Sequence, residues 1–250
     1  MQAIVYAAGL GIRLKSAVPT IPKILLEFGG KTLLEWHAQR LTEAGIERLT
    51  VVSGYEYQLV DRHLARLRER YSLDLRSIVN PLFTEGSVLS MAASIPALQS
   101  VPPNESVLLM DGDVLYPTQF VPRLIGSTHR TSLLIDRDYS TADDDPVLVP
   151  IAGGRPFEFV KRWTGEADTV GESIGFFKVA HEDLPGLIDI VLSMTSGAAR
   201  AASYDEVLRQ MVRAGRFGHE DVTGLPWIEI DFPADVERAA REVLPAIAAL

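Results

Sequence analysis

Two short stretches near the start of the chain carry groups that can hold phosphate. Residues 7–13 have the sequence Ala-Ala-Gly-Leu-Gly-Ile-Arg, directly after the apolar residues 3–5, and a Pro-Lys pair follows at 22–23. Glycines let backbone N–H groups approach an anion closely, while arginine offers a planar donor fork and lysine a point charge. The pattern predicts a phosphate loop after a strand, with these binding residues: Ala7, Ala8, Gly9, Gly11, Arg13 and Lys23.

Acidic residues follow two later apolar stretches. Asp111-Gly112-Asp113 comes after residues 106–110, and Asp231 comes after residues 227–230. In an open parallel sheet, ligands bind outside the carboxyl ends of the strands, so we expect both segments near the phosphate loop. Mg²⁺ binds carboxylates together with phosphate oxygens. A charge that stabilises the last helix is the alternative role for Asp231.

The loop differs from the two commonest nucleotide-binding motifs. It is no P-loop, because no Gly-Lys-Ser/Thr follows at the required distance. It lacks the third glycine of the dinucleotide fingerprint, where Leu14 stands. Taken by themselves, Gly9 and Gly11 also fit an ordinary turn between a strand and a helix.

The combined motifs resemble the sugar-nucleotidyltransferase-like family. They are A-A-G-x-G-x-R-L at 7–14, P-K at 22–23, the acids at 111–113 and the segment 229–231. The resemblance is closest to the phosphocholine, inositol-phosphate and phosphonate cytidylyltransferase branch. Ile12 departs from the pattern, since the family often has Ser or Thr there. The resemblance implies Asp113 and Asp231 as metal ligands for Mg²⁺, and a supporting, nucleotide-side role for Asp111.

The reaction implied by this resemblance is nucleotidyl transfer. An acceptor phosphate or phosphonate oxygen attacks the α-phosphorus of a nucleoside triphosphate, and pyrophosphate leaves. The acceptor is already partly dianionic, so alignment and charge neutralisation replace a general base. We expect Arg13 and Lys23 to act on the nucleotide phosphates. Lys161 is the catalytic candidate that would contact the acceptor phosphate, and Arg162 is the second candidate for this role. The alternative is that Lys161 is an ordinary surface lysine.

The base and the acceptor are less well defined by the sequence. Glu85, Gly86 and Ser87 precede an expected helix and are predicted to contact the base, although Ser87 also fits a plain helix cap. The acceptor-binding candidates are acidic or aromatic residues: Asp143, Asp144, Asp145, Glu172, Tyr204 and Asp205, with Trp163 or Tyr139 as a cation–π wall. Residues 140–145 also fit a solvated loop.

Composition limits the partners and the compartment. A net charge of −9 argues against nucleic acid and against an anionic membrane surface. The chain has no cysteine, which excludes disulfides and thiolate catalysis. There is no apolar signal core and no run of about 18 apolar residues, so we expect a cytoplasmic protein without membrane insertion. The oligomeric state is left open, a homodimer included.

Strands and helices alternate along the first half of the chain. We expect strands at 1–5, 50–54, 75–79 and 106–110, a short strand with a Gly-Gly turn at 25–31, and helices at 32–44, 57–71 and 87–98. Such alternation predicts an α/β fold with a doubly wound, mostly parallel, Rossmann-like sheet. Further β segments at 131–136, 147–151, 156–162 and 173–179 predict a small mixed sheet over the acceptor side. A helix at 203–214, a strand at 227–231 and a last helix from 234, interrupted at Pro245, follow.

These inferences combine into one functional prediction. We expect a single domain over residues 1–250, in which about 117–215 forms the acceptor side. It is predicted to be a Mg²⁺-dependent, CTP-using transferase that joins CMP to a phosphocholine-like, aminoethylphosphonate-like or polyol phosphate acceptor. The alternatives are a hexose-1-phosphate nucleotidylyltransferase using UTP, dTTP or GTP, and a nucleotide-binding regulatory module without catalysis.

Overall fold

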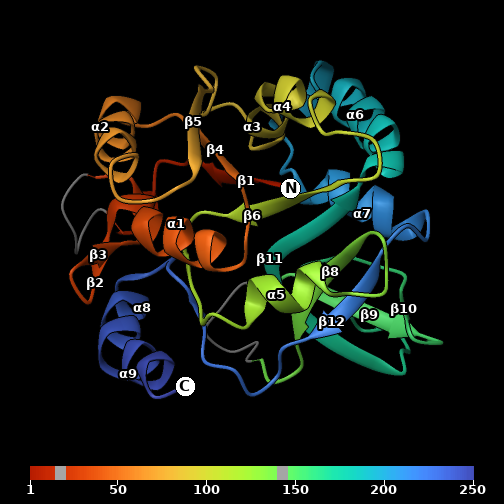
Figure 1. The fold of residues 1–250 in the computed structure, drawn as a ribbon. Coiled ribbons are helices and arrows are strands. Elements are labelled where there is room, and N and C mark those ends of the chain that lie inside the picture. Colours follow the sequence, from red (N-terminus) through yellow and green to blue (C-terminus); the bar gives the residue numbers. More distant parts are fainter. Residues whose placement is uncertain (15–20, 140–145) are drawn as a thin grey trace.

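One large sheet runs through the molecule. The structure is a computed structural model that describes residues 1–14, 21–139 and 146–250. Within these ranges, nine strands form a single sheet in the order β10-β9-β11-β6-β1-β4-β5, and β8 pairs with both β11 and β12 (Figure 1). The α/β class predicted from the alternating pattern is confirmed. Among the described residues, no helix is both long and apolar enough to cross a membrane.

The first half of the chain builds the parallel part of the sheet. Its strands are β1 (Gln2–Ala7), β4 (Arg48–Ser53), β5 (Asp74–Val79) and β6 (Ser106–Asp111). β1 pairs in parallel with β4 on one side and with β6 on the other. The strand order therefore reverses between β1 and β6, and this switch point is where open α/β sheets bind ligands.

Side chains alternate along β1 between two hydrophobic cores. Ala3 and Val5 belong to one cluster, and Ile4 and Tyr6 belong to the other, as the two-residue period of a strand requires. The first core is covered by α1 (Leu33–Glu43), α2 (Tyr57–Leu67) and α5 (Phe120–Ile125). The second is covered by α3 (Val88–Ala93), α4 (Ile95–Gln99), α6 (Leu184–Ser193) and α7 (Asp205–Arg213). The sheet is thus wound on both faces, with α1 and α5 over the same face (Figure 1).

Helix α1 follows its predicted pattern. Thr32 caps its start by accepting a hydrogen bond from the Glu35 backbone N–H at 3.1 Å. Leu33, Leu41 and His37 are fully buried, as their spacing predicts. Burial lowers the pKa of His37 to about 4, so this histidine is a neutral core residue.

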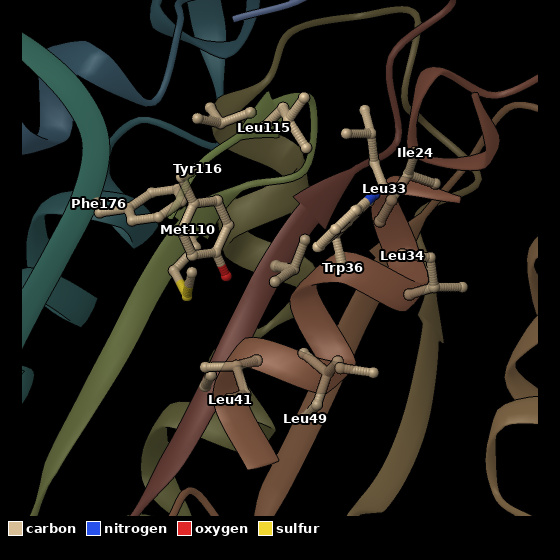
Figure 2. Close-up of a cluster of buried hydrophobic side chains, with 14 of the residues drawn as sticks. Ile24, Leu33, Leu34, Trp36, Leu41, Leu49, Met110, Leu115, Tyr116 and Phe176 are labelled. Carbon is tan, nitrogen blue, oxygen red and sulfur yellow. The ribbon is translucent and has the colours of Figure 1, made fainter. Parts of the chain in front are cut away.

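Aromatic rings fill the space between α1 and the end of β6. Tyr116 lies edge-on to Phe176, with ring centroids 4.7 Å apart, close to Met110 (Figure 2). The Tyr116 hydroxyl lies 3.2 Å from Nδ1 of His37. Leu33, Leu34 and Trp36 of α1 extend this packing toward the parallel strands (Figure 2).

The predicted mixed β region is an extension of the central sheet. Strand β11 (Thr169–Ala180) pairs antiparallel with β6, β8 (Ser132–Asp136) and β9 (Leu148–Ala152), and β9 also pairs with β10 (Arg155–Pro156). The pairing of β11 with β8 shifts register between Ser173 and Phe177, where Gly175 has a φ of +77°. This bulge bends β11 from one set of partners to the other. β12 (Gly218–Asp221), a strand that the sequence pattern does not reveal, adds in parallel to β8.

Several predicted boundaries are wrong, each for a local reason. The helix expected at 87–98 is split at Ser94 into α3 and α4, and Pro96 lies in the first turn of α4. Of the β segment expected at 156–162, only Pro156 at the end of β10 and one bridge from Val160 to Leu148 are present. The last helix continues across Pro245 through α8 (Pro233–Arg238), a π-helical turn (Ala239–Val243) and α9 (Leu244–Ala248). A π turn interrupts the usual hydrogen-bond ladder of an α-helix. This makes it easier to accommodate Pro245, which has no backbone N–H to donate.

Short two-stranded ladders complete the fold. β2 (Glu27–Phe28) and β3 (Lys31–Thr32) form a hairpin around Gly29 and Gly30, which both have positive φ. The short strand and the Gly-Gly turn predicted at 25–31 are confirmed, but the strand begins only at Glu27, because Lys23–Leu25 is a 3₁₀ turn. β7 (Val114–Leu115) pairs antiparallel with β13 (Ile228–Glu229).

Candidate active site

The ends of β1 and β6 lie against each other at the switch point. The Gly112 N–H donates to the Tyr6 carbonyl at 3.0 Å. A Cβ on Gly112 would lie 2.9 Å from both the Ala7 Cβ and the Tyr6 oxygen, so only glycine permits this approach. The phosphate loop predicted at 7–13 and the acids at 111–113 therefore occupy one edge of the sheet, as expected.

The third predicted segment reaches the same edge through the β7–β13 ladder. Glu229 is paired with Val114, and the Ile230 N–H donates to the Asp113 carbonyl at 2.9 Å. This short ladder brings Asp231 beside Asp113, although 118 positions separate them in the sequence. The Asp235 carboxylate accepts from the Asp231 and Phe232 N–H groups at 2.9 and 2.7 Å, which fixes the backbone at Asp231.

Both predicted cations contact these aspartates. The Lys23 ammonium donates to Asp113 at 2.8 Å and also to Asp231. Arg13 donates to the other oxygen of Asp231 at 2.9 Å, and its guanidinium carbon lies 5.2 Å from the ring centre of Phe232. Burial alone would lower the pKa of Lys23, but the Asp113 and Asp231 carboxylates outweigh it and raise the pKa. Lys23 therefore stays charged.

A first cavity of about 540 Å³ opens over the phosphate loop. Six of the predicted nucleotide-binding residues line it, together with both predicted metal ligands. The predicted residues on its wall are Ala7, Gly9, Gly11, Arg13, Lys23, Ser87, Asp113, Lys161 and Asp231. Phe83 and Thr84, which directly precede the residues predicted to contact the base, also line it.

A second cavity of about 290 Å³ adjoins the first. Ala8, Asp111, Glu172, Tyr204 and Asp205 line it. The two cavities share the following lining residues: Tyr6, Gly9, Ser87, Asp113, Lys161 and Asp231. A molecule in either cavity would therefore meet the same cation and the same two carboxylates at the boundary.

Asp111 lies on the wall of the second cavity and not in the first, where a nucleotide-binding role would place it. Its carboxylate accepts a hydrogen bond from the Tyr204 hydroxyl. A Cβ on Gly175 would lie 2.0 Å from the other carboxylate oxygen, so the bulge in β11 makes room for this side chain. Burial, and then the Asp113 charge, raise the pKa of Asp111. Burial and the Asp111 carboxylate likewise raise the pKa of Tyr204.

The stretch predicted to contact the base divides into two parts. Ser87 lines both cavities, and its hydroxyl accepts from the Tyr204 N–H at 3.0 Å. Glu85 instead forms an ion pair of 2.6 Å with Arg200. Gly86 packs so closely that a Cβ would lie 2.3 Å from the Arg200 carbonyl oxygen. Glu85 and Gly86 thus hold the segment around Arg200, and they line neither of these two cavities.

The predicted acceptor residues are spread over two cavities. Glu172 lines the second cavity and also a third one, of about 330 Å³, beside Tyr139 and Trp227. Burial raises the pKa of Asp205, which receives a hydrogen bond from Ser203 and faces the charge of Lys161. Asp143, Asp144 and Asp145 lie outside the described residues.

The two remaining acceptor candidates point elsewhere. Arg162 is exposed and lines none of these three cavities. Trp163 packs on Phe157 with ring centres 5.4 Å apart, and it is also absent from the three cavity walls. Of the two predicted aromatic candidates, Tyr139 alone borders one of these three cavities.

Three carboxylates converge where a divalent cation would fit. Oxygen atoms of Asp113, Glu229 and Asp231 lie within 4.8 Å of one another, a donor set that suits a hard cation. Desolvation in the cleft raises the pKa of Glu229, and repulsion by Asp113 and Asp231 raises it further. Glu229 is exposed to water. Of the two causes that raise its pKa, the repulsion by the neighbouring carboxylates is therefore the one that a bound metal ion would relieve. Glu229 is not among the metal ligands predicted from the sequence. Its i, i+2 spacing from Asp231 is the signal that could have revealed it, since such residues share one side of a strand.

Comparisons with known proteins agree with this geometry. A bifunctional IPC transferase and DIPP synthase of Rubrobacter xylanophilus is 28% identical over 97% of this chain. The chain spans 52% of that relative's length. CTP:phosphoglutamine cytidylyltransferase of Campylobacter jejuni is 21% identical over 75% of this chain and 76% of its own length. N-acetylmuramate alpha-1-phosphate uridylyltransferase of Neisseria meningitidis is 25% identical over 92% of this chain and 93% of its own.

A solved structure and a family model complete the comparison. The inositol-1-phosphate CTP transferase from T. maritima superposes with a TM-score of 0.78 at 23% identity, over 98% of this chain and 95% of the other, which shows the shared fold. The family model of the MobA-like NTP transferase domain matches residues 3–174, which include the phosphate loop, Lys23 and the acids at 111–113. The chain belongs to the MobA-like NTP transferase domain family and is a nucleotidyltransferase.

Proposed function

We propose that the protein transfers CMP from CTP to a small phosphorylated or phosphonylated alcohol and releases pyrophosphate. One observation carries this proposal: Lys161, Asp113 and Asp231 form the boundary shared by the first and second cavities. The first cavity would hold the nucleotide, because the phosphate loop with Arg13 and Lys23 lines it. The second would hold the acceptor. The two substrates would then meet at the residues that both walls share.

The reaction needs alignment more than proton transfer. An acceptor phosphate oxygen forms a bond to the α-phosphorus, and the bond from that phosphorus to the bridging oxygen breaks. Pyrophosphate leaves with the electron pair. Arg13 and Lys23 would neutralise the charge on the transferring and leaving phosphates, and Lys161 would hold the acceptor phosphate. Fixing both phosphates in line removes the entropic cost of bringing them together.

We further propose Mg²⁺ as the cofactor, held by Asp113, Glu229 and Asp231. A bound Mg²⁺ would polarise the phosphoryl oxygens and offset charge that develops during transfer. The fit rests on the three convergent carboxylates and on the hard-oxygen chemistry of that ion. Asp235 would keep Asp231 in place through the two backbone hydrogen bonds that it accepts.

The preference for CTP and for a non-sugar acceptor draws on the relatives. A cytidylyltransferase is among the similar proteins, and the structural neighbour is a CTP transferase. Acidic Glu172 and Asp205 beside the cationic Lys161 suit an acceptor with hydroxyls or an amine in addition to its phosphate. Phosphocholine, aminoethylphosphonate and polyol phosphates meet this description.

Transfer from UTP to a sugar 1-phosphate is the second candidate. It is favoured by the uridylyltransferase relative, which aligns over nearly the full length of both chains. A regulatory module without catalysis is the least favoured, because Arg13, Lys23, Asp113 and Asp231 are all present and in mutual contact.

The test is a grid of pyrophosphate-release assays with Mg²⁺. CTP, UTP, GTP, ATP and dTTP are each combined with phosphocholine, aminoethylphosphonate, inositol phosphate, glycerol phosphate and hexose 1-phosphates, including N-acetylmuramate 1-phosphate. We expect release with CTP and one non-sugar acceptor. Release only with a sugar 1-phosphate would select the second candidate. Tight CTP binding without release from any pair would favour the regulatory module.

A further inference from the structure

Two of the three carboxylates proposed to bind the metal, Asp113 and Asp231, already form ion pairs with side chains of the protein. The Lys23 ammonium contacts Asp113 Oδ2 at 2.8 Å and also Asp231 Oδ1, while Arg13 contacts Asp231 Oδ2 at 2.9 Å. Resting on the proposed function, we propose that Lys23 is a resident cation of the free enzyme. It occupies the metal position, and the divalent cation enters only when nucleotide phosphates draw Lys23 away.

The geometry assigns this place to the ammonium because three carboxylates meet there. Oxygen atoms of Asp113, Glu229 and Asp231 lie within 4.8 Å of one another. Like charges at such distances repel strongly in a partly buried site. Lys23 bridges two of the three, so it supplies the positive charge that the cluster needs when no metal is present.

The lysine is held in this position by its surroundings. Ile24 and Leu25, the next two residues of its 3₁₀ turn, are buried in the core. Gly11, with a φ of +56°, packs so closely that a Cβ would lie 3.3 Å from Cγ of Lys23. The Lys23 side chain is 19% exposed, against 50% for Arg13. The Lys23–carboxylate bridge is therefore a built feature of the site.

The first cavity explains how the bridge opens. Lys23 and Arg13 line the space over the phosphate loop, so triphosphate oxygens there can replace the carboxylates as their partners. Asp113 and Asp231 are then free to bind a metal ion. Nucleotide and metal must consequently strengthen each other's binding by the same factor, as thermodynamic linkage requires.

Binding of Mn²⁺ to the nucleotide-free protein tests this inference. Mn²⁺ binds the same oxygen ligands as Mg²⁺, and electron paramagnetic resonance counts the free ion directly. We expect weak binding to the wild type and at least tenfold tighter binding to Lys23→Met, in which an uncharged chain replaces the ammonium. Lys23→Arg keeps the charge and should bind as weakly as the wild type. Lys31→Met, a distant lysine bonded to Gln39, should also behave as the wild type.

The outcomes separate this inference from the proposed function. Tighter Mn²⁺ binding in Lys23→Met that is lost again in Lys23→Met/Asp113→Asn supports the resident cation. Equal Mn²⁺ affinity in the wild type and Lys23→Met overturns it. If the wild type nevertheless binds Mn²⁺ when CTP is added, the proposed metal-dependent function still stands. A lack of Mn²⁺ binding in all variants, with and without CTP, would refute the metal site itself.

Discussion

The two cavities that meet at Asp113 are built in different ways. The first is framed by loops that directly follow parallel strands, with its phosphate loop after β1 and its acids after β6. The second is framed by the antiparallel strand β11 and by the start of α7. Under the proposed function, the first cavity and its walls form the nucleotide half of the site, and the second cavity and its walls form the acceptor half.

The walls of the two cavities differ in how freely their amino-acid sequences can change. In the nucleotide half, Gly112 and Gly11 allow contacts that a Cβ would disturb, so backbone geometry restricts the sequence. In the acceptor half, side chains such as Glu172, Tyr204 and Asp205 form most of the wall. Side chains can change without altering the fold. We therefore expect the nucleotide half to vary little among relatives, and substrate choice to reside in the acceptor half.

Asp113→Asn should have the largest effect, because Asp113 lines both halves. Loss of its charge removes a proposed metal ligand and a partner of Lys23, and the resulting loss of transition-state stabilisation should lower kcat by about 10³-fold. Steady-state rates of pyrophosphate release measure this. Asp189→Asn, on the exposed side of α6, is the matched control. Wild-type rates in Asp113→Asn, in a protein with a native circular-dichroism spectrum, would remove Asp113 from the site.

Lys23→Ala should affect the nucleotide half alone. We expect it to cost about 2–4 kcal/mol of transition-state stabilisation, the size of one preorganised donor to developing charge. The loss should appear in kcat/KM for every acceptor that the enzyme uses, since Lys23 lines only the first cavity. An acceptor-dependent loss would show that the two halves are not separate, and an unchanged rate would mean that Lys23 does not contact the phosphates.

The sequence predicts which residues come together around the first cavity, because the determinants of that cavity are local. An apolar strand followed by glycines and cations, and a second strand followed by aspartates, suffice once the sheet is parallel. The buried face of α1, with Leu33, His37 and Leu41, follows from helical spacing alone. The metal-ligand prediction stays a prediction, although the structure does bring Asp113 and Asp231 together.

The acceptor half is harder to predict because its contacts are distant in the sequence. Tyr204 meets Asp111 across 93 positions, and only the bulge at Gly175 makes room for that pair. β12 is polar and lacks the alternation of a half-buried strand, so its pairing with β8 leaves no signal. Helix α6 contains Pro185 and Gly186 in its first turn, and neither residue favours a helix, so the sequence pattern does not predict this helix.

Acidification should test the packing beneath the nucleotide half. Burial holds the pKa of His37 near 4 in the folded protein, whereas an unfolded histidine titrates near about 6.5. Between these values only the unfolded chain binds the proton, so stability falls as the pH drops from about 6.5 to 4. From pH 7 to pH 5 the loss should be about 2 kcal/mol. Urea unfolding should show this loss in the wild type and not in His37→Leu; equal pH dependence would contradict it.

Tyr204→Phe should have the smallest effect and should fall on the acceptor half. The change keeps the ring beside Tyr6, 5.5 Å between ring centres, and removes the hydrogen bond to the half-buried Asp111. Leaving a buried acceptor without its donor costs about 1–3 kcal/mol, part of which should appear as a roughly tenfold higher KM for the acceptor.

The discriminating measurement is the KM for each substrate in Tyr204→Phe. CTP should keep its KM, because Tyr204 does not line the first cavity. Tyr57→Phe, at the start of α2 and outside all three cavities, is the control. A rise in the KM for CTP that matches the rise for the acceptor would show that Asp111 and Tyr204 support both halves through Ser87, whose hydroxyl accepts from the Tyr204 N–H. Residues that line only the second cavity would then also contribute to binding of the nucleotide.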